Sequence, residues 1–553
     1  MIATAANHLY LAAAATHRAR FERAARDPGS TQRRILHDLL RANRDTSFGR
    51  EHGFAGIRTL ADFRARVPLS DFEGVRGYVE RIAAGEEGVL TREPVRFVEP
   101  SGGSSGASKL VPYTASLLRE FSAATMPWVF DLLWSRPALR GGRAYWAVSP
   151  PGRRPERTEG GVRIGMEHDS DYFPRPVRAV LDRVIGVPRA VSRAPDMASC
   201  RYLTLLALLG MPDLAMASVW NPSFLTLLAD ALDADWERLL RDLERGGCGI
   251  PLSASLRAEI APRFPARPAR AAGLRARFGR AAPEDLGAVW ERLALVSCWT
   301  DAHARRALDG MRRRFPGVEV QGKGLLATEG VVSFPLFAAG GAVAAVGSHF
   351  LELIPEDGGE PRLADEVEEG RVYEVALTTG GGLFRYRLRD LVRVEGWHHR
   401  APVLAFLGRA DRTSDLAGEK LTAPFAERVL SAAEARPGIR ARFAMLAPSW
   451  GAPPRYLLFA ETDPASAALL AAEAERLLAE SHPYALCRAL GQLGPLEGVP
   501  VVDGERAYEL ACARRGQRAG DVKPAALDPR LGWEADMAGA HTETQRHGGE
   551  SSG

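Results

Sequence analysis

The chain contains only four lysines, Lys109, Lys323, Lys420 and Lys523, among 72 lysines and arginines. The ammonium group of lysine is a compact point charge on a flexible stem, whereas the guanidinium of arginine is a broad planar fork. A chain that otherwise uses arginine favours lysine where a point charge matters, for example against a phosphate that moves during a reaction. Chance placement is the alternative, and the residues around each lysine must decide between the two.

The first lysine ends a glycine- and serine-rich segment, Ser101 to Lys109, which follows a short apolar stretch at 95–98 that we predict to be a strand. Glycines let backbone N–H groups approach an anion closely, and the hydroxyls of Ser104 and Ser105 can donate further hydrogen bonds. The ammonium of Lys109 would add positive charge at the rim. We therefore predict a loop that binds nucleotide phosphates.

Other interpretations of this segment compete with that prediction. A Walker P-loop requires glycine immediately before its lysine, and Ser108 stands there. The residues from Gly102 to Gly106 formally match the GxSxG turn of serine hydrolases, with Ser104 as nucleophile, but that turn leads directly into a helix. Pro112 follows too soon for such a helix, because the residue before a proline disfavours helical geometry. An ordinary flexible loop remains open.

A second polar segment places the hydroxyl of Thr328 beside the carboxylate of Glu329, between glycines and after a predicted strand. Together they could hold a phosphate and a magnesium ion, because Mg²⁺ prefers one or two carboxylates together with waters and phosphate oxygens. The alternative is the start of a helix with Thr328 as its N-cap.

A third segment reads as a turn followed by a strand, with Asp390 near the end of that strand. A carboxylate there can accept hydrogen bonds from both ribose hydroxyls of a nucleotide. The alternative is a surface ion pair with Arg387 or Arg389. Lys420 and Lys523 each lie in a polar segment that contains glycine, and each alone could equally be a solvated surface lysine.

The elements that must position these residues follow from hydrophobic periodicity. Residues 1–90 read as helices, and the apolar residues of 31–43 fall on one helical face. Helical patterns dominate from 115 to about 295, and strands then alternate with helices, which indicates an α/β fold. The predicted later strands are 293–296, 318–320, 331–334, 342–346, 372–377 and 391–394.

The length of 553 residues predicts more than one domain. The chain becomes polar and turn-rich at 408–418, which we interpret as a hinge. It would join a large N-terminal α/β domain, 1–408, to a small C-terminal α+β domain, 409–530. The last residues, 531–553, are predicted to form a disordered tail.

Composition restricts the class of protein. A hydrophobic content of 46% and a net charge of +4 are typical of an ordinary globular protein, and nucleic acid is not an expected partner. Five scattered cysteines without CxxC spacing argue against disulfides and zinc, which suits a reducing compartment. No apolar run is long enough for a membrane span, and no signal peptide is evident, so we expect a cytoplasmic protein with no membrane partner. We also expect a monomer.

Taken in order, these segments and several others resemble the GH3 acyl acid amido synthetases, which belong to the larger class of adenylate-forming enzymes. The resemblance covers nearly the whole chain, and the order and spacing of its motifs make it specific. The motifs are Asn43 to Gly49, Asp62 to Leu69, Lys109 to Thr114, Ala327 to Glu329, Tyr386 to Asp390, Gly408 to Asp411, Gly491 to Glu497 and Val522 to Pro524.

The resemblance implies a two-domain α/β fold of the adenylate-forming type, in which the small C-terminal domain closes over the large one. It implies that ATP and a carboxylic acid form an acyl-adenylate, and that the amine of an amino acid then attacks to give an amide and AMP. The cofactors would be ATP and Mg²⁺, and the partners would be the carboxylic acid and the amino acid acceptor.

At the matching positions, the resemblance implies that the ATP phosphates are held by Ser104, Ser105, Gly106 and Lys109. Thr328 and Glu329 would contact the AMP phosphate and the magnesium ion, with Glu329 as the metal ligand. Asp390 would contact the ribose.

The remaining implied roles belong to the hinge and the C-terminal domain. Lys420 would reach the α-phosphate, and Lys523 would be a second catalytic lysine in the adenylation conformation. Arg409 and Asp411 would be neighbours of the hinge, with Arg409 counted among the nucleotide-binding residues. Gly102 replaces a hydroxyl residue that is usual in the loop.

The acyl pocket is predicted from aromatic residues, because these suit an apolar or aromatic acid. The candidates are Trp220, Trp299 and Thr300, and the alternative is that both tryptophans belong to the core. Two other functions stay open. One is an adenylating ligase that hands its acyl group to a thiol, such as coenzyme A or a carrier, and the other is a catalytically silent nucleotide-binding protein.

Overall fold

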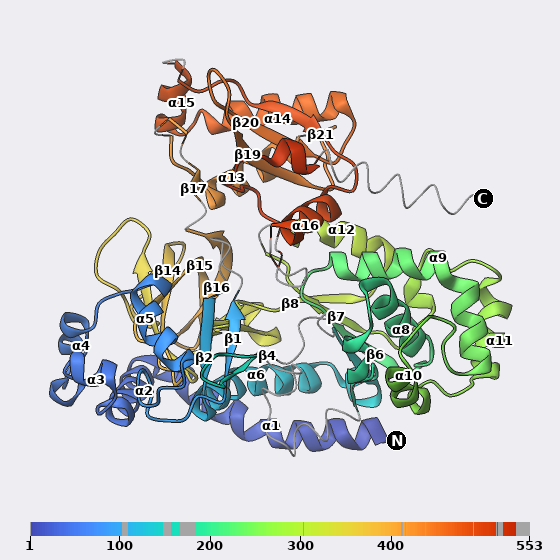
Figure 1. Cartoon of the computed structure of the whole chain (residues 1–553), viewed down its shortest axis with the longest axis horizontal. Helices are drawn as coiled ribbons and strands as arrows, with labels where there is room; N and C mark the ends of the chain where they lie inside the picture. Colours follow the sequence, from blue (N-terminus) through green and yellow to red (C-terminus); the bar gives the residue numbers. More distant parts are fainter. Residues whose placement is uncertain are drawn as a thin grey trace.

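The computed structural model describes residues 2–101, 109–147, 156–165, 184–301, 304–410, 413–414, 416–417, 419–436, 438–489, 492–515, 517, 522 and 524–537. Figure 1 shows a broad lower part, formed by the chain up to about 410, and a smaller C-terminal part above it. None of the described helices is both long enough and apolar enough to span a bilayer.

Helices form the N-terminal region, as predicted. They are α1 (Ile2–Arg26), α2 (Pro28–Asn43), α3 (Ser47–Glu51), α4 (Leu60–Arg66) and α5 (Phe72–Ala83). Capping residues begin two of these helices. Thr59 and Asp62 form a reciprocal capping box at the start of α4, and Asp71 is the N-cap of α5. Figure 1 shows α1 running beneath α6 (Ala115–Ser135) along the base of the molecule.

A six-stranded antiparallel sheet lies at the centre of the large part. Its strand order is β11 (Ser333–Leu336), β12 (Gly341–Ala344), β16 (Ala401–Arg409), β15 (Tyr386–His398), β14 (Val372–Thr378) and β13 (Phe350–Pro355). The predicted strand at 391–394 is only the middle of β15. Both faces are largely buried along β13 and β14, which explains their nearly continuous apolar runs.

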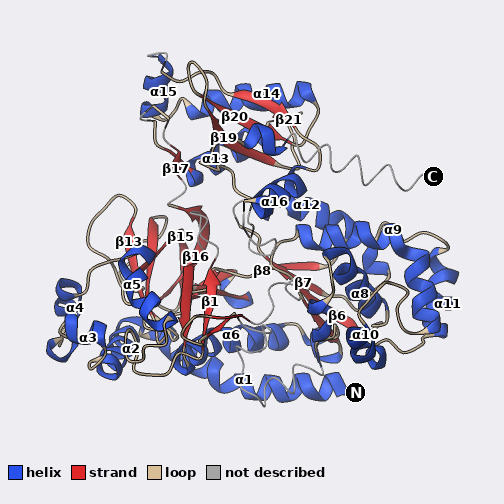
Figure 2. Ribbon diagram, viewed as in Figure 1, coloured by secondary structure: helices blue, strands red, loops and turns tan. Residues whose placement is uncertain are grey.

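The second sheet of the large part is four-stranded and parallel, with the order β3 (Arg143–Trp146), β6 (Leu214–Ser218), β7 (Leu295–Cys298) and β8 (Glu319–Gly322). Helices dominate 115 to 295, as predicted, but β3 and β6 also lie inside that range and were not predicted. The connecting and flanking helices are α8 (Met197–Leu209), α9 (Ser223–Arg245), α10 (Ala254–Ile260), α11 (Pro268–Phe278) and α12 (Ala304–Arg314), which Figure 2 shows around the sheet.

Smaller strand pairs complete the large part. β1 (Phe97–Ser101) and β2 (Lys109–Tyr113) form an antiparallel pair that β5 (Arg163–Ile164) and β4 (Glu156–Arg157) extend. β9 (Leu326–Ala327) and β10 (Gly330–Val331) form a tight hairpin. Lys109 therefore begins a strand, and Thr328 and Glu329 form the turn of a hairpin.

The C-terminal part has its own sheet and its own core. β17 (Thr413–Ser414) pairs with β18 (Leu421–Thr422), and β19 (Ala444–Ser449), β20 (Arg455–Ala460) and β21 (Glu497–Pro500) form a sheet. The helices are α13 (Ala423–Glu434), α14 (Pro464–Leu478), α15 (His482–Ala489) and α16 (Gly504–Arg514).

The predicted disordered tail from 531 starts too early. Trp533 is fully buried and its ring stacks on Tyr508, so a large apolar contact holds this segment in place.

Candidate functional site

The Thr328–Glu329 hairpin is tied to the strand that begins with Lys109. The hydroxyl of Tyr113, at the other end of β2, donates a 2.6 Å hydrogen bond to the carbonyl of Thr328. Glu329 is only 8% exposed. The alternative that Thr328 caps a helix was wrong, because this residue lies between two paired strands. Ser104, Ser105, Gly106 and Gly102 lie outside the described residues.

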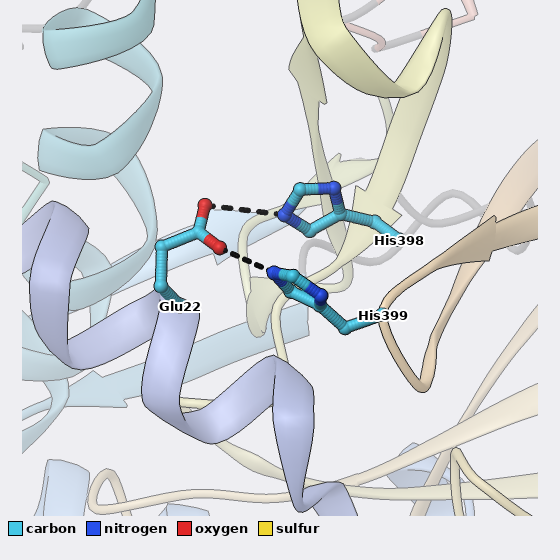
Figure 3. Close-up of side chains that lie close together, drawn as sticks. All are labelled: Glu22, His398 and His399. Carbon is cyan, nitrogen blue, oxygen red and sulfur yellow. Dashed lines mark hydrogen bonds and ion pairs between the residues drawn. The ribbon is translucent and has the colours of Figure 1, made fainter.

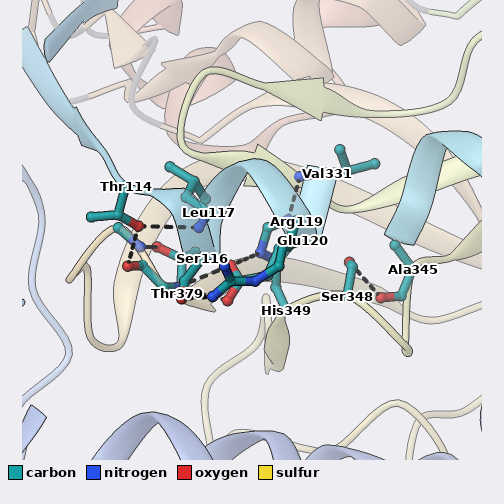
Figure 4. Close-up of polar contacts among 12 residues, drawn as sticks. Thr114, Ser116, Leu117, Arg119, Glu120, Val331, Ala345, Ser348, His349 and Thr379 are labelled. Carbon is teal, nitrogen blue, oxygen red and sulfur yellow. Dashed lines mark hydrogen bonds and ion pairs between the residues drawn. The ribbon is translucent and has the colours of Figure 1, made fainter. Parts of the chain in front are cut away.

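A buried histidine fixes the hairpin from its other side (Figure 4). The N–H of Val331 donates to Nε2 of His349 at 3.0 Å, and Nδ1 of His349 lies 2.9 Å from the carboxylate of Glu120. Since Nε2 accepts a hydrogen bond, Nδ1 carries the proton and donates a hydrogen bond to the Glu120 carboxylate. Glu120 also accepts from the N–H of Gly380. This chain of hydrogen bonds from Val331 through His349 to Glu120 fixes the position of β10, the strand that directly follows Glu329.

We expect His349→Ala to destabilise the fold by about 2–3 kcal/mol, because it leaves the buried Val331 N–H and the Glu120 carboxylate without their partner. Equilibrium denaturant unfolding measures the change. The control is Ser348→Ala, which removes one buried hydroxyl bonded to the Ala345 carbonyl and should cost about 1 kcal/mol. Equal losses in the two variants would mean that the hydrogen bonds of His349 add nothing beyond an ordinary hydrogen bond.

Asp390 is buried, with 6% exposure, and pairs with Arg409 across β15 and β16. Their side chains form an ion pair with 3.5 Å between Arg409 Nη1 and Asp390 Oδ1. The alternative pairing with Arg387 or Arg389 was wrong: Arg387 donates to Glu374 at 2.8 Å. The prediction that Asp390 lies near the end of its strand was also wrong, because it lies in the first half of β15.

Lys109 and Asp390 are positioned on neighbouring elements. The ammonium of Lys109 lies 6.0 Å from the centre of the Phe72 ring, in the first turn of α5. Asp71, the cap of α5, accepts a 3.3 Å hydrogen bond from Arg389, the residue beside Asp390. Burial would raise the pKa of Asp71, but the Arg389 guanidinium and the backbone N–H groups of α5 outweigh it and hold that pKa below its usual value.

Lys420 belongs to the C-terminal part and is exposed to solvent. Its backbone has a positive φ of 46°, a left-handed geometry that is uncommon for residues other than glycine. The preceding residue, Glu419, enforces it: this buried carboxylate accepts from the N–H groups of Leu416 and Ala417 and from the Tyr456 hydroxyl. The buried Glu419 therefore anchors the backbone directly before the exposed lysine. Lys523 and Asp411 lie outside the described residues.

Helix α16 of the C-terminal part meets the large part at Asn221, which donates to Glu505 at 3.3 Å. Glu509, one turn further along α16, is affected by the charge of Arg201 on α8. Burial and the neighbouring carboxylate of Glu505 raise the pKa of Glu509 to about 7. This contact between the two parts therefore contains a carboxyl group that is half protonated near neutral pH.

We expect Glu509→Gln to remove part of the pH dependence of stability between about pH 4.5 and 7. The folded pKa lies above the ordinary value of 4.5, so the folded state binds more protons in that window. The free energy of unfolding of the wild type should therefore fall relative to that of the variant as the pH rises from about 4.5 to 7. Above pH 7 the difference between the two proteins should stay constant. Thermal unfolding of both proteins measures this, with the exposed Glu497→Gln as control. Parallel curves for all three proteins would contradict the assignment.

The predicted acyl-pocket residues lie together at the carboxyl ends of the parallel strands. The rings of Trp220 and Trp299 are 5.4 Å apart, and Thr300 lies against Gly322, where an added Cβ would come within 2.5 Å of its hydroxyl. Lys323, which follows Gly322 directly, is buried among tryptophans here. Its one signal in the sequence is the scarcity of lysine.

A separate cluster has side chains typical of a metal site (Figure 3). Glu22 of α1 pairs with His398 at 3.1 Å and with His399 at 2.8 Å. Arg18 also pairs with Glu22, at 2.7 Å. Burial would raise the pKa of Glu22, but these partners hold it below its ordinary value. A guanidinium on the same carboxylate disfavours a divalent cation, so we interpret the cluster as a hydrogen-bonded link between α1 and the end of β15.

Comparisons with known proteins cover most of the chain. Residues 17–320 match the GH3 family N-terminal domain, and residues 342–409 match the GH3 family central domain. A probable indole-3-acetic acid-amido synthetase GH3.12 of Oryza sativa subsp. japonica is 26% identical over 436 residues, which are 70% of each chain. A jasmonoyl–L-amino acid synthetase GH3.3 of the same subspecies is 29% identical over 237 residues, 41% of this chain and 50% of that protein.

Among solved structures, the GH3.15 acyl acid amido synthetase superposes with a TM-score of 0.80 at 18% identity, over 94% of this chain and 95% of that chain. A second structure, of AtGH3.15 in complex with 2,4-DB, gives the same TM-score over 92% of both chains. These likenesses confirm the predicted α/β fold, which is that of the GH3.15 structures. Because the N-terminal domain match alone spans more than half of the 553 residues, the chain belongs to the GH3 family.

Proposed function

We propose that this protein is an ATP-dependent acyl acid amido synthetase, which adenylates a carboxylic acid and transfers the acyl group to the amine of an amino acid. Membership of the GH3 family carries the proposal, since the relatives named above are amido synthetases. The positions of Lys109, Thr328, Glu329 and Asp390 support it, because they come from elements that hydrogen bonds and ring contacts tie together.

The first step replaces a poor leaving group by a good one. The acid's carboxylate attacks the α-phosphorus of ATP, a bond forms between oxygen and phosphorus, and pyrophosphate leaves. Two anions must meet, so the site must cancel negative charge, which is the task we assign to Lys109, Lys420 and the backbone N–H groups of the 101–109 loop. Asp390 would accept hydrogen bonds from the ribose and orient the nucleotide.

A magnesium ion fits the chemistry of the Thr328–Glu329 pair. The buried Glu329 carboxylate and the Thr328 hydroxyl are hard oxygen donors, which Mg²⁺ prefers. When bound, the ion would neutralise phosphate charge. The protein's own contribution is to hold the pair in place through Tyr113 and His349.

In the second step an amine, not ATP, reacts with the activated acid, so a different set of groups must reach the acyl-adenylate. The amine of the amino acid attacks the acyl carbon, AMP leaves, and the amine loses a proton, with much of the acceleration coming from proximity. We propose that a C-terminal domain, 409–530, turns about the 408–418 stretch relative to a large domain, 1–408. This movement would bring Lys420 or Lys523 to the nucleotide, with Arg409 next to the hinge. We also propose that the protein acts as a cytoplasmic monomer.

A screen of carboxylic acids tests the proposal. Purified protein with ATP, Mg²⁺ and each acid is assayed for release of pyrophosphate, and mass spectrometry then identifies the product formed with amino acids or with coenzyme A. We expect acid-dependent pyrophosphate release and an amide. A thioester would instead identify the thiol-dependent ligase, and no acid-dependent release with any acid would favour the catalytically silent alternative.

A further inference from the structure

A row of side chains crosses one face of the parallel sheet at the carboxyl ends of its strands. Trp146 of β3 pairs in register with Ser218 of β6, Ser218 with Ser297 of β7, and Ser297 with Gln321 of β8. Neighbours in register point to the same face of a sheet. The carboxyl ends of parallel strands are also where α/β proteins usually bind their ligands.

Lys323 directly follows β8, and its side chain lies against this row. Its ammonium donates a 2.6 Å hydrogen bond to the hydroxyl of Ser218 and is 5.2–5.3 Å from the ring centres of Trp128, Trp146 and Trp220. The residue is only 4% exposed. Indole faces attract a cation, so the three rings suit the ammonium group of Lys323.

Two further polar groups of the row make no hydrogen bond to any part of the chain that the structure describes. One is the hydroxyl of Ser297, a fully buried residue, and the other is Nε2 of Gln321, which is 7% exposed. Trp128 fixes the Gln321 amide by donating Nε1 to its oxygen at 2.9 Å, which leaves the NH₂ group as the free end. Buried donors without partners are costly and rare in folded proteins.

We propose that this cluster of tryptophans, Lys323, Ser297 and Gln321 binds the far end of the acyl substrate, and that the substrate is a dicarboxylic acid with a flat or apolar body. Its second carboxylate would accept hydrogen bonds from Lys323, Ser297 and Gln321, and its body would lie against the indole rings. The inference rests on the proposed function, because it names the substrate class of that same acyl pocket, which includes Trp220 and Trp299.

The second carboxylate, not the reacting one, belongs at Lys323. An ammonium and two amide or hydroxyl donors stabilise the ground state of a carboxylate, and holding the nucleophile this tightly would slow its attack on phosphorus. Lys323 and Thr328 are five residues apart, so at most about 18 Å of extended chain separates them. An aromatic or short-chain diacid fits within that span.

Matched pairs of acids test the proposal, namely benzoate with terephthalate and hexanoate with adipate. Acid-dependent pyrophosphate exchange is measured with the wild type and with Lys323→Met, which keeps the length of the side chain but removes its charge. We expect the wild type to use at least one diacid about 10- to 100-fold better, in kcat/KM, than the matched monoacid. The variant should lose that advantage through KM while its use of the monoacid changes little.

Ser297→Ala provides a gentler variant, should Lys323→Met fail to fold. It should weaken use of the diacid by about tenfold and leave the monoacid unaffected. Diacid-induced stabilisation against heat, measured without ATP, reports binding directly, and Lys323→Met or Ser297→Ala should diminish it.

Several results would overturn the inference. They are a wild-type preference for every monoacid over its diacid, equal losses for both acids in the variants, or no thermal stabilisation by any diacid. Exchange with monoacids alone would reject the diacid and leave the proposed function standing. If no acid supports exchange, the proposed function fails, and thermal stabilisation by diacids alone decides whether the pocket binds them.

Discussion

Lys420→Ala should slow adenylation by about a hundredfold or more and leave the fold intact. Removing one contact to a charge that develops in the transition state typically costs a few kcal/mol, on the order of 10²–10³ in rate. The side chain is exposed, so its loss should not affect packing. Alanine keeps the Cβ of lysine, so the positive φ of 46° costs the variant about as much as the wild type. Acid-dependent pyrophosphate exchange measures the rate.

A matched control comes from the same part of the molecule. Arg440→Ala also removes one exposed positive charge from the C-terminal part, so it reports the general effect of charge on ATP binding. We expect a change of less than about twofold there. An exchange rate near that of the wild type in Lys420→Ala would remove this lysine from the catalytic machinery and leave Lys523 as the candidate.

The sequence predicted most strands of the antiparallel sheet but missed part of the parallel one. Strands such as 372–377 are long, apolar and bounded by turns, so their pattern is clear. By contrast, β6 (Leu214–Ser218) is five fully buried residues that follow a buried helix, and a short apolar run cannot be told from helix by periodicity alone. Its parallel partners lie far away in sequence, so only tertiary structure identifies it.

In the candidate site, too, local sequence patterns identified some residues but not the distant residues that contact them. The polar segments at Thr328 and Asp390 could be found from residue types and spacing, whereas their partners could not. Alternation along β15 makes neighbouring residues face opposite ways, so Asp390 pairs with Arg409 on the next strand instead of with an adjacent arginine. Lys323 depends on tryptophans from three separate segments, and no local pattern could bring them together.

Glu329→Gln should lower kcat/KM for adenylation by about a hundredfold and raise the concentration of Mg²⁺ needed for half-maximal rate. Glutamine has the same shape and keeps one oxygen, but it lacks the charge that a hard divalent cation prefers. Neutralisation of the phosphates in the transition state would therefore weaken. Pyrophosphate exchange across a Mg²⁺ titration measures both quantities.

Glu473→Gln is the matched control, because Glu473 on α14 is also 8% exposed and its partners are arginines of the C-terminal part. It should leave the Mg²⁺ dependence unchanged, even where breaking its ion pairs costs some stability. A Glu329 variant with the wild-type Mg²⁺ dependence and a uniformly lower rate would show that this carboxylate positions the hairpin and does not bind the metal. Unchanged rates at every Mg²⁺ concentration would exclude both roles, since a buried carboxylate beside the phosphates should affect one or the other.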